Sequence, residues 1–98
     1  MGRKYFTITG MWHHSGSDFF EKGLEVFLEK EHENEYDTEA IRVKVEGLGK
    51  VGYVANSPRT KKGESMSAGR LYDKIGETAR GEVLHVLSDG IVCFLIEE

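Results

Sequence analysis

Residues 31–54, with the sequence EHENEYDTEAIRVKVEGLGKVGYV, join an acidic turn to the most regular strand pattern of the chain. From Ala40 to Val45, apolar and charged residues alternate, which is the two-residue period of a strand with one buried face. The glycines of Glu46-Gly47-Leu48-Gly49 suit a tight turn, and Lys50–Val54 follows as a partner strand. This stretch therefore predicts a β-hairpin with a polar turn directly before it.

Similar strand patterns occur on both sides of this hairpin. Runs of β-branched, aromatic and alternating apolar residues, bounded by glycines or polar turns, predict four more strands, over Arg3–Thr9, Leu24–Lys30, Thr78–Leu87 and Ile91–Ile96. Phe27 interrupts the polar face of the second of these, which indicates that this strand packs on both sides.

Two helical segments separate the predicted strands. A short helical turn is predicted within Ser17–Gly23, because a serine-aspartate pair can cap it and the glycine can end it. A helix is predicted to begin at Ser67 and to end at Gly76, because apolar residues between them recur at the i, i+3, i+4 and i+7 positions. The polar stretch Ala55–Ser67 is expected to be a surface loop. The fold class we expect is mainly β (α+β), a six-stranded antiparallel OB-like barrel with one covering helix and a short helical turn.

Length and composition are those of a single globular domain. The 98 residues are expected to form one domain over residues 1–98, and the hydrophobic and charged fractions are 39% and 31%. No apolar run approaches the roughly 18 residues that span a bilayer, and Met1–Gly10 lacks the apolar segment of a signal peptide. We therefore expect a cytoplasmic protein with no membrane partner. The one cysteine, Cys93, lies in the run IVCFLI and is expected to be a buried small hydrophobe.

Charge is unevenly distributed along the chain. The net charge of −4 argues against generic nucleic-acid binding, which depends on lysine and arginine. Residues 29–39 carry six acidic side chains and one lysine, whereas residues 59–80 carry six basic and three acidic side chains. The second segment leaves room for a local basic surface, although a solvated face explains both segments equally well.

Asp37 has two possible roles in the turn before the hairpin. Its carboxylate can accept hydrogen bonds from backbone N–H groups two and three residues later, which would cap the turn. Alternatively it faces a pocket and accepts a hydrogen bond from a ligand hydroxyl, with the ring of Tyr36 beside it for stacking. Tyr53 is open to a similar choice between a half-buried barrel position and a contact with phosphate or sugar.

A second group of candidate residues lies in the loop after the first strand. Trp12, His13 and His14 follow one another on a polar loop, and exposed planar rings are stacking platforms for bases. A metal site is the competing interpretation. The spacing disfavours it, because adjacent histidines on an extended segment point to opposite faces and no paired-ligand spacing accompanies them.

The motif Asn34-x-Tyr36-Asp37, followed by Ala40-Ile41-x-Val43 and then by Gly52-Tyr53-Val54, resembles the core of HIRAN domains. The resemblance implies a small β-barrel that binds the 3′ end of single-stranded DNA. In this turn the chain lacks two prolines that HIRAN domains often have, and it carries additional glutamates. The DNA-binding residues expected on this basis, including basic residues for backbone contacts, are Trp12, His13, His14, Asn34, Tyr36, Asp37, Tyr53, Arg59, Lys61 and Lys62.

The expected function is therefore a nucleic-acid-binding module for DNA repair or replication. A carboxylate such as Asp37 attracts a terminal 3′-hydroxyl and repels a phosphate, which would give selectivity for ends. The alternative is a non-enzymatic protein-interaction module, or a phage or mobile-element accessory protein, that meets a basic partner through the acidic turn. No enzyme is expected, because no nucleophile is paired with a recognisable base and no phosphate-binding glycine loop precedes a helix. We also expect no cofactor, metal or small-molecule substrate.

Overall fold

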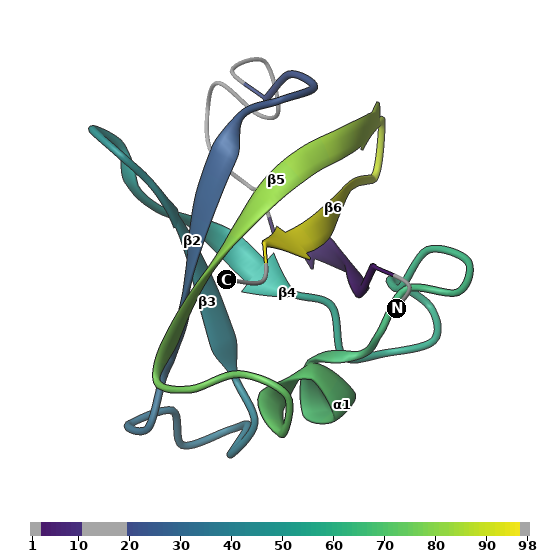
Figure 1. Cartoon of the computed structure of the whole chain (residues 1–98). Helices are drawn as coiled ribbons and strands as arrows, with labels where there is room; N and C mark the ends of the chain where they lie inside the picture. Colours follow the sequence, from purple (N-terminus) through teal and green to yellow (C-terminus); the bar gives the residue numbers. More distant parts are fainter. Residues whose placement is uncertain (1–2, 11–19, 97–98) are drawn as a thin grey trace.

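The computed structural model describes residues 3–10 and 20–96. Within them, six strands and one short helix follow in the order β1 (Tyr5–Thr9), β2 (Glu25–Lys30), β3 (Ile41–Val45), β4 (Gly49–Val54), α1 (Ala68–Tyr72), β5 (Thr78–Leu87) and β6 (Gly90–Ile96). All neighbouring strands are antiparallel, and they close into a barrel in the order β1-β4-β3-β2-β5-β6 (Figure 1). The predicted six-stranded barrel is confirmed.

The core lies inside the barrel and is built by the alternation predicted from the sequence. On β3, the side chains of Ile41, Val43 and Val45 are buried, whereas Arg42 and Lys44 point outward. Every strand contributes buried side chains to one cluster, and α1 adds Ala68 and Leu71 from the end of the barrel that it covers (Figure 1). A single apolar core therefore holds the strands and the helix together.

The helix is shorter than its apolar spacing predicted. The hydroxyl of Ser67 accepts a hydrogen bond from the backbone N–H of Arg70, which makes Ser67 the N-cap and confirms the predicted start of the helix. The helix ends at Tyr72 rather than before Gly76, because the N–H of Lys74 bonds to the carbonyl of Leu71 in a tighter turn. Of the predicted helical turn within Ser17–Gly23, residues 17–19 lie outside the described residues.

An irregularity in β4 changes which side chains face outward. Val43 is paired with Gly52, but the next residue of β3, Lys44, is paired with Lys50, so Val51 is an extra residue in β4. Val51 and Gly52 are both buried, and Lys50 is exposed. The bulge therefore places Lys50 on the same outer face of the sheet as Tyr53, three residues later.

The loop between β4 and α1 is fastened to the barrel rather than lying loosely on its surface. The hydroxyl groups of Thr7 and Ser65 are 2.9 Å apart and both residues are buried. The hydroxyl of Thr7 also accepts a hydrogen bond from the N–H of Lys62, and the N–H of Met66 bonds to the carbonyl of Tyr5 at 2.7 Å. The expectation of an exposed loop is wrong at Ser65, which helps to anchor the segment.

The structure bears on the predicted burial of Cys93 and on the predicted lack of a membrane-spanning segment. Cys93 is fully buried, and its burial raises the pKa of the thiol to about 12, as expected for a small core residue. Within the described ranges, no helix is long and apolar enough to cross a membrane.

Candidate nucleic-acid interface

The segment from Glu31 to Ala40, which we call the acidic turn, is organised by the side chain of Asn34. Its carbonyl oxygen accepts hydrogen bonds from the backbone N–H groups of Tyr36 and Asp37 at 2.8 and 2.9 Å. The ends of the turn are joined by a bond from the N–H of Glu31 to the carbonyl of Ala40. These contacts are those of an asparagine-centred turn, and they order a segment that contains no proline.

Asp37 has the predicted capping role and keeps one oxygen for another partner. Its Oδ1 accepts a hydrogen bond from the backbone N–H of Glu39 at 2.9 Å. Among the described residues, no donor reaches its second carboxylate oxygen. The side chain is partly buried, so the carboxylate both fixes the turn and presents an acceptor at its surface.

Tyr36 is the most exposed large hydrophobic side chain among the described residues. It retains 96% of its accessible surface, while its backbone is held by Asn34. A ring in this position contributes little to the core and is accessible from solvent. It is therefore available for stacking against another planar group.

Glu31 links the acidic turn to the barrel. Its Oε1 accepts hydrogen bonds from the hydroxyl of Tyr53 at 2.6 Å and from the amide of Asn34 at 2.9 Å. Its Oε2 accepts a bond from Arg42 at 3.3 Å, and only 12% of the Glu31 side chain is exposed. One carboxylate therefore connects the turn after β2 to side chains on β3 and β4.

Competing effects set the charge state of Glu31. Burial favours the neutral acid, but the hydrogen bonds from Tyr53 and Asn34 and the positive charges of Lys50 and Arg42 outweigh it. The pKa of Glu31 is consequently lower than its ordinary value. The ionised carboxylate is the form that holds this network together.

Tyr53 is half-buried, and protein groups occupy its hydroxyl. The phenol oxygen donates to Glu31 and accepts a hydrogen bond from the ammonium group of Lys50 at 3.0 Å. The same ammonium group lies 4.8 Å from the centre of the tyrosine ring. In this structure Tyr53 offers its ring and its Lys50 neighbour to a ligand, rather than its hydroxyl.

The other predicted contacts are placed elsewhere or lie outside the described residues. Lys62 is paired with Asp89 at 2.6 Å, and Lys61 bonds to the carbonyl of Gly63. Arg59 is exposed in the same loop, which lies well apart from the acidic turn across α1 (Figure 1). The structure therefore does not bring these three residues to the turn. Trp12, His13 and His14 lie outside the described residues.

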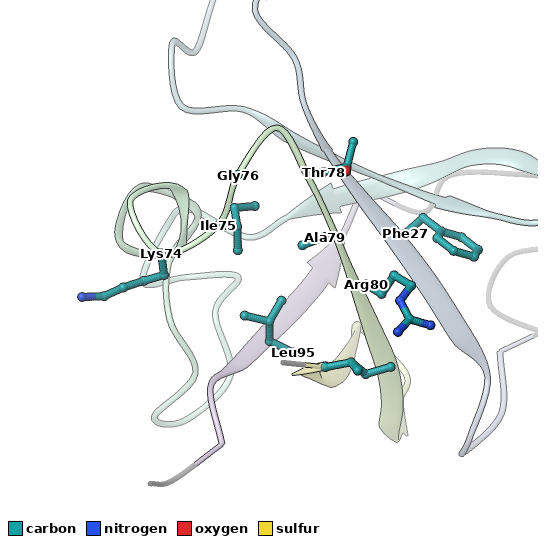
Figure 2. Close-up of a pocket in the computed structure, with 9 residues that line it drawn as sticks. Phe27, Lys74, Ile75, Gly76, Thr78, Ala79, Arg80 and Leu95 are labelled. Atoms are coloured by element: carbon teal, nitrogen blue, oxygen red, sulfur yellow. The ribbon is translucent and has the colours of Figure 1, made fainter. Parts of the chain in front are cut away.

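A cavity of about 560 Å³ opens beside the start of β5. Phe27 and Arg80 line one side and Ile75 and Leu95 lie on the other (Figure 2). The complete lining consists of Phe27, Lys74, Ile75, Gly76, Thr78, Ala79, Arg80, Leu95 and Ile96. Its size suits a small planar group, and it mixes apolar walls with two cations. In the part of the chain that is described, no cluster of three or more metal-ligating side chains occurs.

Sequence reasoning missed Glu31 and Lys50 as members of the interface. The position of Glu31 directly after a strand gave a weak signal, but its partners depend on which strands are neighbours. Lys50 was hidden by the bulge, since residues three apart on a regular strand face opposite sides. Both residues became visible only with the register of β3 and β4.

Comparison with known proteins identifies the first part of this arrangement. The family model for the HIRAN domain matches residues 1–60, which include the acidic turn and Tyr53. No curated protein and no solved structure gives a match. Domains of the matching family are associated with nucleic-acid binding.

Proposed function

Because the chain belongs to the HIRAN domain family, we propose that it binds the 3′ end of single-stranded DNA at the acidic turn. The observation that carries the proposal is the Tyr36 ring, 96% exposed on a backbone that Asn34 holds in place. Stacking of a base on an exposed aromatic ring contributes roughly 1–3 kcal/mol. Because the backbone that carries the ring is already ordered, less conformational freedom is lost when a base binds.

Asp37 supplies the selectivity for an end. Its unoccupied carboxylate oxygen lies one residue from the stacking ring and can accept a hydrogen bond from a 3′-hydroxyl. A phosphate in the same place would carry a like charge and would be repelled. The acidity of the turn thus restricts binding to free ends, which are produced during DNA repair and replication.

The proposal is tested by fluorescence anisotropy with two oligonucleotides that differ only at the 3′ end. We expect the 3′-hydroxyl form to bind near micromolar concentration and the 3′-phosphate form to bind at least several-fold more weakly. Equal binding of the two would contradict the role of Asp37. The substitution Tyr36→Ala should weaken both by about fivefold or more, because a stacking partner is lost.

Asp37→Asn is the sharper variant for selectivity. An asparagine oxygen can still accept the hydrogen bond from the backbone N–H of Glu39, so the turn should keep its shape. Because the negative charge is gone, the ratio of the affinity for the 3′-hydroxyl form to that for the 3′-phosphate form should fall toward one. Glu35→Gln removes a charge from the exposed side of the same turn and should leave the preference intact.

The rival function, binding of a basic protein through the acidic turn, predicts a different salt response. Contacts led by exposed glutamates should fade as the screening length falls to about 8–10 Å near physiological salt. Base stacking should survive the same change. No DNA binding at any salt concentration would favour the rival.

A further inference from the structure

Four outward-facing residues form a continuous row across the sheet, which we call the cationic row. Phe27 on β2 is paired with Arg80 on β5 and with Lys44 on β3. Lys44 is in turn paired with Lys50 on β4. Directly paired residues of antiparallel strands point to the same face. Three cations and one aromatic ring are therefore aligned perpendicular to the strands, in a protein whose net charge is −4.

The pairing of Lys44 with Lys50 leaves positive charge without full compensation. Like charges directly opposite each other destabilise a sheet, so such a pair needs another explanation. Lys44 has one acidic neighbour, Glu29, at 3.4 Å, and that carboxylate already accepts a bond from Arg42 at 2.8 Å. The hydrogen bond of Lys50 goes to the neutral hydroxyl of Tyr53, and the carboxylate of Glu31, on which the charge of Lys50 acts, is shared with Arg42. Both lysines are exposed.

The opposite end of the row is different in character. Arg80 is paired with Glu25 at 2.6 Å, so its charge is largely balanced. Phe27 is half-buried beside it, and both residues line the cavity at the start of β5 (Figure 2). The row thus runs from two exposed ammonium groups to a partly exposed ring at the mouth of a cavity. With strands about 4.8 Å apart, three spacings cover about 14 Å, the scale of a short run of nucleotides.

We propose that the cationic row is the path of the single strand that leads to the 3′ end. Phosphates bind Lys44 and Lys50, and a base stacks on Phe27 at the cavity. This inference rests on the proposed function, because Lys50 connects the row to the acidic turn through Tyr53 and Glu31. It assigns the backbone contacts to the outer face of β3 and β4 instead of to Arg59, Lys61 and Lys62.

The test is the salt dependence of single-stranded DNA binding by a Lys44→Gln/Lys50→Gln double variant. Each phosphate contact in a single strand contributes about 0.7 to the slope of log K against log salt, so the slope should fall by about 1.4. Affinity for an oligothymidylate of about ten nucleotides should drop at least tenfold near 50 mM salt. A matched control, Lys22→Gln/Arg70→Gln, removes two exposed cations outside the row and should retain the wild-type slope. Equal slopes for the two double variants would overturn the proposal.

Two further variants separate this proposal from structural effects and from the proposed function. Lys44→Gln alone does not touch Tyr53 or Glu31, and it should lower the slope by about 0.7. Phe27→Leu keeps an apolar side chain on β2. It should weaken the binding of a long oligonucleotide about fivefold or more and leave the binding of a dinucleotide unchanged. If the 3′-hydroxyl preference persists while all row variants bind like wild type, the proposed path along the row is contradicted and the proposed 3′-end site is supported. If wild type binds no single-stranded DNA, both proposals fall together.

Discussion

The acidic turn, residues 31–40, and the basic loop, residues 55–67, are both polar connections, yet the barrel uses them in opposite ways. The turn is ordered by its own side chains, above all Asn34, and it leaves Tyr36 almost fully exposed. The loop is hydrogen-bonded to β1 through Ser65 and Thr7, and Lys62 forms an ion pair with Asp89. The comparison teaches that the charge of a segment does not tell whether its groups are available to a partner.

The largest expected effect comes from releasing the basic loop. Thr7→Val keeps the shape of the buried side chain but removes the hydroxyl that contacts Ser65 and the N–H of Lys62. Because the N–H of Lys62 loses its acceptor and Ser65 keeps only its bond to the carbonyl of Lys62, the free energy of unfolding should fall by about 2–3 kcal/mol. Hydrogen exchange should accelerate at Lys62. Thr78→Val, at an exposed position, should change stability by less than about 0.5 kcal/mol. Equal effects of the two substitutions would show that the loop is not anchored as described.

Loosening the acidic turn should have the next largest effect. Glu31→Gln removes the charged acceptor shared by Tyr53, Asn34 and Arg42. We therefore expect the free energy of unfolding, measured with urea at neutral pH, to fall by about 1–2 kcal/mol. Glu33→Gln, on the exposed side of the turn, should be close to neutral. Perturbed backbone resonances of Asn34 and Tyr36 in the first variant only would confirm that Glu31 positions the turn.

The wild-type protein and the Glu31→Gln variant should also differ in how their stability depends on pH. The pKa of Glu31 is lowered in the folded state, so its ionised form stabilises the fold. That contribution is fully present above its unfolded value near 4.5 and is lost as the pH falls through the lower folded value. The stability difference between wild type and Glu31→Gln should therefore shrink as the pH is lowered from 5 to about 3. A difference that grows on acidification would have the wrong sign for this network.

The smallest expected effect tests the pairing of Lys62. Lys62→Gln removes an ion pair whose acidic partner is 70% exposed, so the free energy of unfolding should change little. Lys62 holds the pKa of Asp89 below its ordinary value, mainly through its hydrogen bond. An NMR titration of the Asp89 carboxyl group should show a higher pKa in the variant. An unchanged value would mean that Lys62 is available to a ligand after all.

The barrel itself was predictable because its signal is local. Alternation along residues 40–45 and the glycine-bounded hairpins identify strands without knowledge of their neighbours, and the helix cap at Ser67 is also a short-range pattern. The end of α1 was less predictable, since the apolar spacing continues to Ile75 after the backbone has turned. Packing of Ile75 against the core from a turn satisfies the same pattern as packing from a helix.

The interface was predictable only in part. Asn34, Tyr36 and Asp37 form a contiguous motif, and the structure places them together in one ordered turn. Tyr53, which bonds to Glu31, and Asp89, which pairs with Lys62, lie 22 and 27 residues away from them along the chain, and no short-range pattern specifies such pairs. Spacing alone therefore identified the turn and Asn34, but not the contact of Glu31 with Tyr53 or the pairing of Lys44 with Lys50.

The extra residue in β4 has a consequence for how relatives of this chain should be compared. Because Val51 is inserted opposite the Val43/Lys44 step, every side chain before it on that strand is displayed on the reverse side from the one that simple alternation assigns. Deletion of Val51 would remove the bulge and leave Lys50 on the outer face, because Lys50, Gly52 and Tyr53 would then alternate as in a regular strand. Relatives with and without the extra residue can therefore present a lysine at the same place on the sheet, although its distance along the chain from Tyr53 differs. Alignments made by strand pairing, rather than by residue identity, are the ones that reveal which family members carry it.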